Sequence, residues 1–205
     1  MRMGSIARIP KDQILDAALK MLIRDGYDSI NIKTLAKELG CSTQPISWHF
    51  GSMPNLRKEL TEAAFQYADK KMIPPPDDVV AIDRFREMGN RYIDLAYDEP
   101  NLARFLTEAH EGHTFAEQFI EILDRSMDET MSRQIADVLS VSVDQAEHLI
   151  QTLMLYVQGL VTMILSDRAQ LESKEVAYEM IQRVGRNYMI GIGADMKRAD
   201  ALRAK

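Results

Sequence analysis

The chain has 205 residues, of which 46% are hydrophobic and 27% are charged, and its formal net charge is −6 at pH 7. This length allows one sizeable core or two unequal domains. The single cysteine, Cys41, excludes an internal disulfide and a multi-cysteine metal site. The apolar runs are short and interrupted by charge, and the N-terminus lacks the apolar part of a signal peptide. We therefore expect a soluble cytoplasmic protein that does not enter a membrane.

The charge is unevenly distributed along the chain. Residues 1–58 carry nine Lys/Arg and five Asp/Glu, a net charge of +4, which leaves −10 for the remainder. One basic module can bind a polyanion while the rest of the chain stays acidic. A segment this mildly basic is also typical of a solvated surface, so charge alone leaves both interpretations open.

Apolar residues recur at three- and four-residue spacing along nearly the whole chain, and no strand-like alternation occurs. This pattern predicts an all-α protein. The prolines at 74–76 mark the sharpest break, and the stretch after Gly191 is expected to fray. We expect nine helices, at about residues 10–25, 31–40, 42–51, 53–71, 78–97, 100–110, 114–139, 143–165 and 174–189.

The second and third helices are joined by a tight turn at residues 40–42, which is the arrangement of a helix-turn-helix. We expect Cys41, Ile46 and Phe50 to face the core. The outward residues can contact DNA, because amide and hydroxyl groups bond base edges or phosphates and an indole can meet a thymine methyl. This outward set is Thr43, Gln44, Pro45, Ser47, Trp48 and, at the end of the helix, His49. The alternative is that Trp48 is a partly buried hinge residue and that the polar positions are only solvated.

Four motifs extend this pattern from residue 10 to about residue 60. They are IP…ILDAAL, DGY at 25–27, LAKELGCS at 35–42 and ISWHFGSM at 46–53. In order and spacing they resemble the DNA-binding domain of the TetR family of bacterial transcriptional regulators. The resemblance implies a helix-turn-helix domain over residues 1–52 and an effector-binding and dimerisation domain over residues 53–205.

The resemblance also implies roles for individual residues. Asn31 and Lys33 would bind phosphate at the start of the second helix, and Thr43, Gln44 and Pro45 would read bases. Trp48 and His49 would meet the sugar-phosphate backbone or a base methyl. Two positions depart from the family pattern: Ser47 replaces a usual tyrosine and Met53 a usual lysine, both phosphate contacts. These departures imply weaker DNA binding, or compensation by Lys33 and an N-terminal arm with Arg2 and Arg8.

Two apolar stripes near the C-terminus resemble the helix pair with which this family dimerises. Their spacing is also typical of an ordinary core, although Gly159 would permit close approach. The dimer interface is predicted at Ile150, Leu153, Val157, Leu160, Ile164, Ile181, Val184 and Tyr188.

The middle region is rich in aromatic residues and methionine, which can line an adaptable apolar cavity. Any one of these residues is typical of plain core, but the resemblance implies that the region holds a small effector, often hydrophobic or planar. The predicted ligand contacts are Tyr67, Phe85, Met88, Tyr92, Phe105, His110, Phe119 and Met127. Glu108, Glu111 and His113 join His110 in a metal-like composition, but their irregular spacing and Gly112 favour a solvated loop. We expect no metal and no cofactor.

These features predict a homodimeric, ligand-responsive repressor whose partners are double-stranded operator DNA and a small, largely apolar effector. The alternative is an all-α enzyme or small-molecule carrier with an incidental helix-turn-helix. The sequence contains no Gly-rich phosphate loop, HExxH motif or nucleophile elbow, so nothing favours an enzyme.

Overall fold

The computed structural model describes residues 9–72, 75–76, 78–107, 129–166 and 171–203. Every regular element in these ranges is helical, which confirms the all-α prediction. The helices are α1 (Lys11–Asp25), α2 (Ile32–Glu38), α3 (Gln44–Phe50), α4 (Met53–Lys71), α5 (Ala81–Asp98), α6 (Pro100–Thr107), α8 (Glu129–Leu139), α9 (Val143–Leu165), α10 (Lys174–Gly191) and α11 (Met196–Arg203), with a single 3-10 turn at Tyr27–Ser29.

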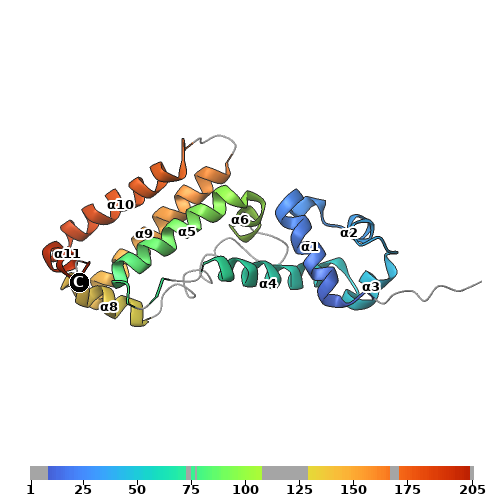
Figure 1. The fold of residues 1–205 in the computed structure, drawn as a ribbon, viewed down its shortest axis with the longest axis horizontal. Coiled ribbons are helices and arrows are strands. Elements are labelled where there is room, and N and C mark those ends of the chain that lie inside the picture. Colours follow the sequence, from blue (N-terminus) through green and yellow to red (C-terminus); the bar gives the residue numbers. More distant parts are fainter. Residues whose placement is uncertain (1–8, 73–74, 77, 108–128, 167–170, 204–205) are drawn as a thin grey trace, which may run out of the picture.

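Helices α1, α2 and α3 form a small bundle at one end of an elongated molecule (Figure 1). Their apolar faces bury Ile14, Leu35 and Ile46 completely or nearly so. Two glycines with positive φ flank α3, at +64° for Gly40 and +70° for Gly51. Residues other than glycine rarely adopt a positive φ, so these two glycines determine how the chain enters and leaves α3.

Helices α5, α9 and α10 lie side by side at the other end of the molecule, where α8 and α11 cover their tips (Figure 1). Small residues allow the three long helices to approach closely. A Cβ atom placed on Gly89 of α5 would lie 3.6 Å from Val157 of α9, and one on Gly185 of α10 would lie 3.4 Å from Leu153 of α9. We call these five helices, α5, α8, α9, α10 and α11, the body. Helix α9 lies at its centre, because it contacts α5, α8 and α10.

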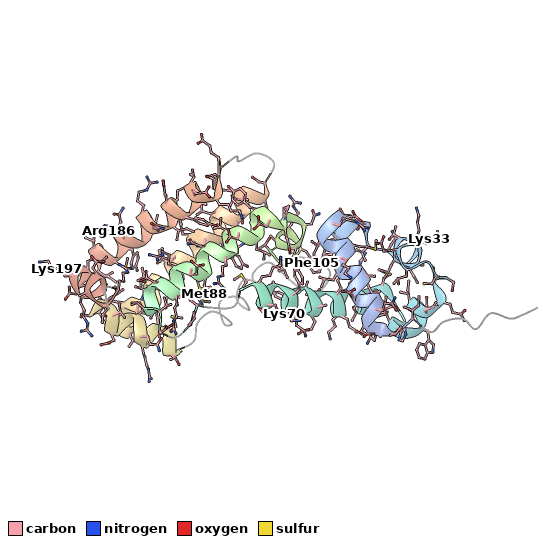
Figure 2. All side chains as sticks on the ribbon, viewed as in Figure 1. Lys33, Lys70, Met88, Phe105, Arg186 and Lys197 are labelled. Atoms are coloured by element: carbon pink, nitrogen blue, oxygen red, sulfur yellow. The ribbon has the colours of Figure 1, made fainter. Side chains whose placement is uncertain are left out.

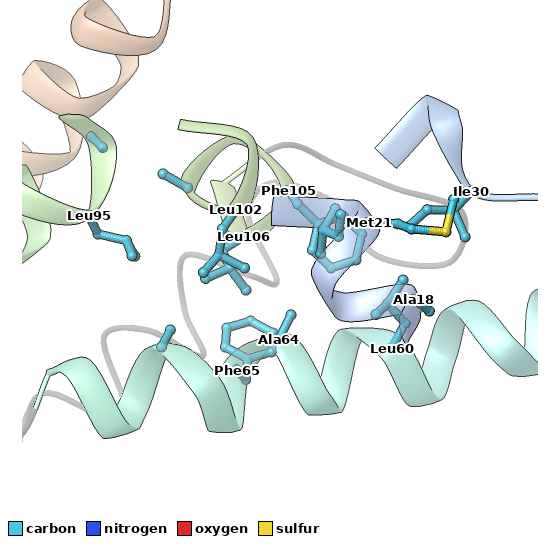
Figure 3. Packing of buried hydrophobic residues seen from close by; sticks show 14 of the residues in the cluster. Ala18, Met21, Ile30, Leu60, Ala64, Phe65, Leu95, Leu102, Phe105 and Leu106 are labelled. Atoms are coloured by element: carbon cyan, nitrogen blue, oxygen red, sulfur yellow. The ribbon is translucent and has the colours of Figure 1, made fainter. Parts of the chain in front are cut away.

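Helix α6 joins the two ends of the molecule. Leu102, Phe105 and Leu106 of α6 pack between Met21 of α1 and Phe65 of α4 (Figure 3). The Phe105 ring lies 5.0 Å from the ring of Tyr27, measured between centroids. The core of the N-terminal bundle therefore continues into the body, and the boundary between residues 52 and 53 stays a prediction.

Most helix bounds agree with the predictions within a few residues, and those of α4 and α9 agree fully. Helix α3 begins at Gln44, two residues later than predicted. The stretch after Gly191 was wrongly expected to fray. It forms α11, which is held on α8 by a hydrogen bond of 2.8 Å from Asp195 N to Leu139 O and an ion pair of 2.9 Å between Arg198 and Asp137.

Helix α9 also corrects the expectation that no segment could span a bilayer. Among the described residues it alone is long and apolar enough for this, with a mean hydropathy of 1.5 over its most apolar window. Its apolar character has a simpler cause. One face is buried against α5, α8 and α10, and the opposite face exposes Leu155 and Met163.

Candidate DNA-binding face and ligand cavity

The outer face of α3 carries the side chains that can meet DNA. Thr43, Gln44, Ser47 and Trp48 are exposed, and Trp48 keeps 68% of its surface accessible. Ile46 and Phe50 are 2% and 4% exposed and hold the opposite face in the core. An indole this exposed in a folded domain suits contact with a partner molecule. The hinge alternative for Trp48, which needed partial burial, does not fit.

The start of α2 is shaped by Asn31. Its Oδ1 accepts hydrogen bonds from the backbone N–H groups of Lys33 and Thr34, at 3.0 and 3.1 Å, and Thr34 Oγ1 accepts one from Asn31 N at 3.1 Å. This capping box satisfies helix N–H groups that would otherwise need another acceptor. The Lys33 side chain is exposed at the end of the molecule remote from Arg186 (Figure 2).

His49 and Met53 both contact other parts of the same chain. The Nε2 atom of His49 lies 2.9 Å from the carbonyl oxygen of Ile9. Because a carbonyl oxygen can only accept a hydrogen bond, Nε2 carries the proton and donates. This hydrogen bond holds the chain before α1 against α3. Met53 is partly buried and packs against the core, and Cys41 is also half-buried there. Pro45 is partly buried as well.

The body contains a cavity of about 230 Å³ that is lined by residues of α5, α9, α10 and α11 and by Met72, which follows α4. Three predicted ligand residues, Phe85, Met88 and Tyr92, line it. Burial raises the pKa of the Tyr92 phenol far above its ordinary value. Gln158 also lines the cavity, is 7% exposed, and its Nε2 atom has no hydrogen-bond partner in the part of the chain that the structure describes.

The other predicted ligand residues do not line this cavity. The Tyr67 hydroxyl donates a hydrogen bond to Glu99, and Phe105 is 2% exposed against Tyr27, so both lie at the junction between α4, α6 and the N-terminal bundle. His110, Phe119 and Met127 lie outside the described residues, as do Glu108, Glu111 and His113. No group of three or more possible metal ligands occurs among the described residues.

Comparison with known proteins identifies the N-terminal segment. Residues 14–60 match the model of a family described as bacterial regulatory proteins, tetR family. The chain carries a tetR-family domain. The family resemblance seen in the sequence is thereby confirmed. No curated protein matches the chain in sequence.

Most of the chain has the fold of solved transcriptional regulators that are described as TetR-like or tetR-family. It superposes on a TetR-like transcriptional regulator from Rhodococcus sp. RHA1 with a TM-score of 0.62 and 12% identity, over 93% of this chain and 100% of the other. For a tetR-family transcriptional regulator from Streptomyces coelicolor the TM-score is 0.63 and the identity 16%, over 98% and 90%. A TetR variant from Acinetobacter baumannii AYE in complex with minocycline gives 0.52 and 19%, over 89% and 96%.

The tetR-family domain is attached to the body through specific polar contacts. The Asn101 side chain at the start of α6 donates hydrogen bonds to the carbonyl oxygens of Ile23 and Arg24, at 3.1 and 3.2 Å. These carbonyls end α1 and have no partner within their own helix. On the other side, Tyr67 of α4 is bonded to Glu99. Helix α6 and the α5–α6 corner therefore contact both α1 and α4.

Most of the predicted dimer residues are buried within a single chain. Ile150, Leu153, Val157, Leu160 and Ile181 are between 0% and 8% exposed within one chain, so they face its own core and have almost no surface to offer a partner. Ile164, Val184 and Tyr188 are only partly buried. The apolar stripe of α9 is its inward face, and this face meets α5, α8 and α10.

Several cavity residues were missed by sequence reasoning. Gln158 looks like an ordinary polar position in an apolar helix, and Arg86 and Arg186 look like solvated surface charges. Arg203 was placed in a fraying tail. Only their three-dimensional convergence on one cavity singles them out. Helical spacing could at most have placed Gly89, Arg86 and Tyr92 on neighbouring positions of one face.

Proposed function

We propose that this protein is a homodimeric transcriptional regulator that binds operator DNA through α3 and is a repressor released by a small, largely apolar effector. The observation that supports this proposal is the exposed outer face of α3. Thr43, Gln44, Ser47 and Trp48 extend from a helix whose ends are fixed by two glycines and whose inner face is fully packed. In a tetR-family domain such a helix enters the major groove with its N-terminal residues at the base edges.

The effector would act through α4. Two residues separate the start of this helix from the end of α3, and Met72, which follows its C-terminus, lines the cavity. A helix of this length spans about 28 Å, so a small rotation at one end displaces the other. Two half-sites about 34–36 Å apart require a matching separation of the two recognition helices. A ligand that shifts Met72 would therefore change the affinity for DNA, in the sense of a coupling between two sites.

The solved relatives support a ligand of this kind. The Acinetobacter TetR variant is a complex with minocycline, so the shared fold holds a small molecule in that protein. In this chain the cavity is lined largely by methionine, aromatic and aliphatic side chains, which suits an apolar ligand.

Dimerisation would use the outer face of α9 in place of the buried stripe. Gln151, Leu155, Gly159 and Met163 recur every four residues and are all exposed, with 59% of Leu155 and 44% of Met163 accessible. A Cβ atom on Gly159 would meet nothing within 4 Å in its own chain. Glycine costs a helix about 1 kcal/mol relative to alanine, and close approach of a second helix would account for its presence.

The proposal is tested by an electrophoretic mobility shift assay, which measures how strongly the protein retards a DNA fragment. The purified full chain should retard a fragment from upstream of its own gene at low salt without ligand, and Gln44→Ala should weaken binding about tenfold. Gln66→Ala is the control, since Gln66 is exposed on α4 and bonds Glu62. The proposal fails if no fragment is retarded, or if the two variants lose affinity equally.

The alternative is an all-α carrier or enzyme with an incidental helix-turn-helix. Its single favourable observation is the cavity, which a carrier also needs. Turnover of a bound ligand together with no affinity for DNA at about 50 mM salt would support this alternative.

A further inference from the structure

The lining of the cavity in the body combines arginine and neutral polar side chains with apolar ones. We infer that its ligand is a compact apolar acid, with its carboxylate between Arg86 and Arg186 and a hydroxyl or carbonyl group at the far end bonded to Gln158. The cavity and its polar groups are features of the single chain. The inference therefore rests on the proposed function only where it identifies this ligand with the effector.

The register of the helices separates the two ends. Gly89 of α5 lies against Val157 of α9, and Gly185 of α10 lies against Leu153. Helices α5 and α9 run in the same direction, since Ile82 clusters with residues 146–153 and Ile93 with residues 157–161. Helix α10 runs in the opposite direction, because Tyr178 and Lys174 bond Asp94 and Asp98.

This register places Arg86, one turn before Gly89, and Arg186, next to Gly185, towards the same end of the cavity. Tyr92 lies one turn after Gly89, and Gln158 follows Val157, so these two lie towards the other end. The ribbon shows α5 and α10 flanking α9 along this whole length (Figure 1). The cavity therefore has an arginine end and an end with neutral hydrogen-bonding groups.

The arginine end keeps a surplus of positive charge. Asp83, the only acidic residue among the described residues that line the cavity, is shared between Arg203, at 2.7 Å, and Arg86, at 3.0 Å. Arg203 is also paired with Asp200 at 2.8 Å. Arg186 has no ion pair with any residue that the structure describes. Guanidinium groups bind carboxylates through paired N–H donors, so this end is complementary to an acid.

The opposite end has unpaired hydrogen-bonding groups. The Gln158 side chain is more than nine-tenths buried, and leaving such a donor without a partner costs about 1–3 kcal/mol. A hydroxyl or carbonyl oxygen of a ligand would remove this cost. The Tyr92 hydroxyl also has no hydrogen-bond partner among the described residues and, as a neutral phenol, can act as a second donor. Burial raises its pKa further above neutral pH.

The middle of the cavity limits the size and polarity of the ligand. Phe85, Met88, Leu153, Met154 and Met189 supply apolar walls that can adapt to a flat or branched body. The volume of about 230 Å³ lies below the range of roughly 300–1,000 Å³ that is usual for drug-sized ligands. One or two fused rings, or a branched chain of similar size, fit this space.

The inference is tested by calorimetric titration of the purified full chain with three probes of one ring system. They are naphthoic acid, naphthol, and the hydroxynaphthoic acid whose two groups lie at opposite ends of the rings. The hydroxy acid should bind tightest. Arg186→Ala should weaken both acids about tenfold and leave naphthol unchanged, whereas Gln158→Leu should weaken only the two hydroxyl-bearing probes.

The matched control is Arg183→Ala, because Arg183 is exposed one turn earlier on α10 but does not line the cavity. The inference is overturned if the acids bind no tighter than naphthol, or if Arg183→Ala weakens them as much as Arg186→Ala. Retention of upstream DNA is measured on the same preparations. If the acids bind but do not change DNA binding, the inferred ligand class stands and the proposed regulation by this ligand is overturned. If the protein binds DNA but not the acids, the proposed DNA-binding function stands and the inferred ligand class is overturned.

Discussion

The hydroxyl group of Tyr67 on α4 donates a hydrogen bond of 3.0 Å to Oε1 of Glu99, at the corner between α5 and α6. Lys71, one turn further along α4, bonds the same oxygen, and this hydrogen bond raises the pKa of the Lys71 ammonium group. The C-terminal half of the helix that follows α3 is thus fastened to the body. In the proposed regulator, this corner is a point about which α4 would turn.

Replacing Tyr67 with phenylalanine tests this attachment. Tyr67→Phe removes one hydrogen bond and leaves the ring in place, so the free energy of unfolding should fall by about 1 kcal/mol in urea denaturation at fixed protein concentration. Tyr156→Phe is the control, because the Tyr156 hydroxyl has no hydrogen bond among the described residues. Equal losses in the two variants would show that the contact with Glu99 contributes nothing specific.

Asn101 tests the attachment of α1 to α6. Asn101→Ala leaves the carbonyl groups of Ile23 and Arg24 without this donor and should cost about 1 kcal/mol of stability. Asn101→Asp should cost more, since at neutral pH its carboxylate can only repel the two carbonyl oxygens. Thermal unfolding measures both, with Asn187→Ala, an exposed change on α10, expected to stay within roughly 0.5 kcal/mol. An aspartate variant as stable as the alanine variant would contradict this account.

His49 is expected to affect DNA binding through the chain before α1. His49→Phe removes the hydrogen bond to Ile9, and deletion of residues 1–8 removes Arg2 and Arg8. Each change should weaken DNA binding by about threefold to tenfold, measured by fluorescence anisotropy of labelled DNA. Because both act on the same segment, the double variant should be little weaker than either single one. Additive losses would instead indicate that His49 contacts DNA independently.

The outer face of α9 gives a prediction about oligomeric state. Leu155→Arg and Gly159→Leu should each shift the protein from dimer to folded monomer in light scattering after size-exclusion chromatography. Both sites face open space in one chain, so neither change should disturb its own core. Gln66→Arg on α4 adds the same charge elsewhere and should remain dimeric. Retention of the dimer by both α9 variants would place the interface on another surface.

The sequence predicted the helices of the tetR-family domain well, because turns, helix caps and apolar spacing depend on residues close together in the chain. Glycines at 40 and 51, the cap at Asn31 and the spacing of Ile46 and Phe50 determine the turn and the inward face without reference to the rest of the chain. His49 escaped this reasoning. Its partner Ile9 lies 40 residues earlier, and no short-range pattern indicates that contact.

The body was harder to predict because an apolar stripe does not reveal what covers it. Leu153 and Val157 satisfy the spacing of a dimer seam, yet α5 and α10 cover them within one chain. The cavity residues were found where aromatic and methionine side chains cluster, as at Phe85 and Met88. Gln158 and Arg186 gain their significance only from the register of three helices.

The most direct test of the central claim uses Trp48, the only tryptophan in the chain. Its side chain is 68% exposed on the outer face of α3. We predict that tryptophan fluorescence changes on titration with the upstream DNA and saturates at two chains per duplex, because each protomer would place one α3 in a half-site. An unchanged signal at saturating DNA would place Trp48 away from the interface and contradict the account.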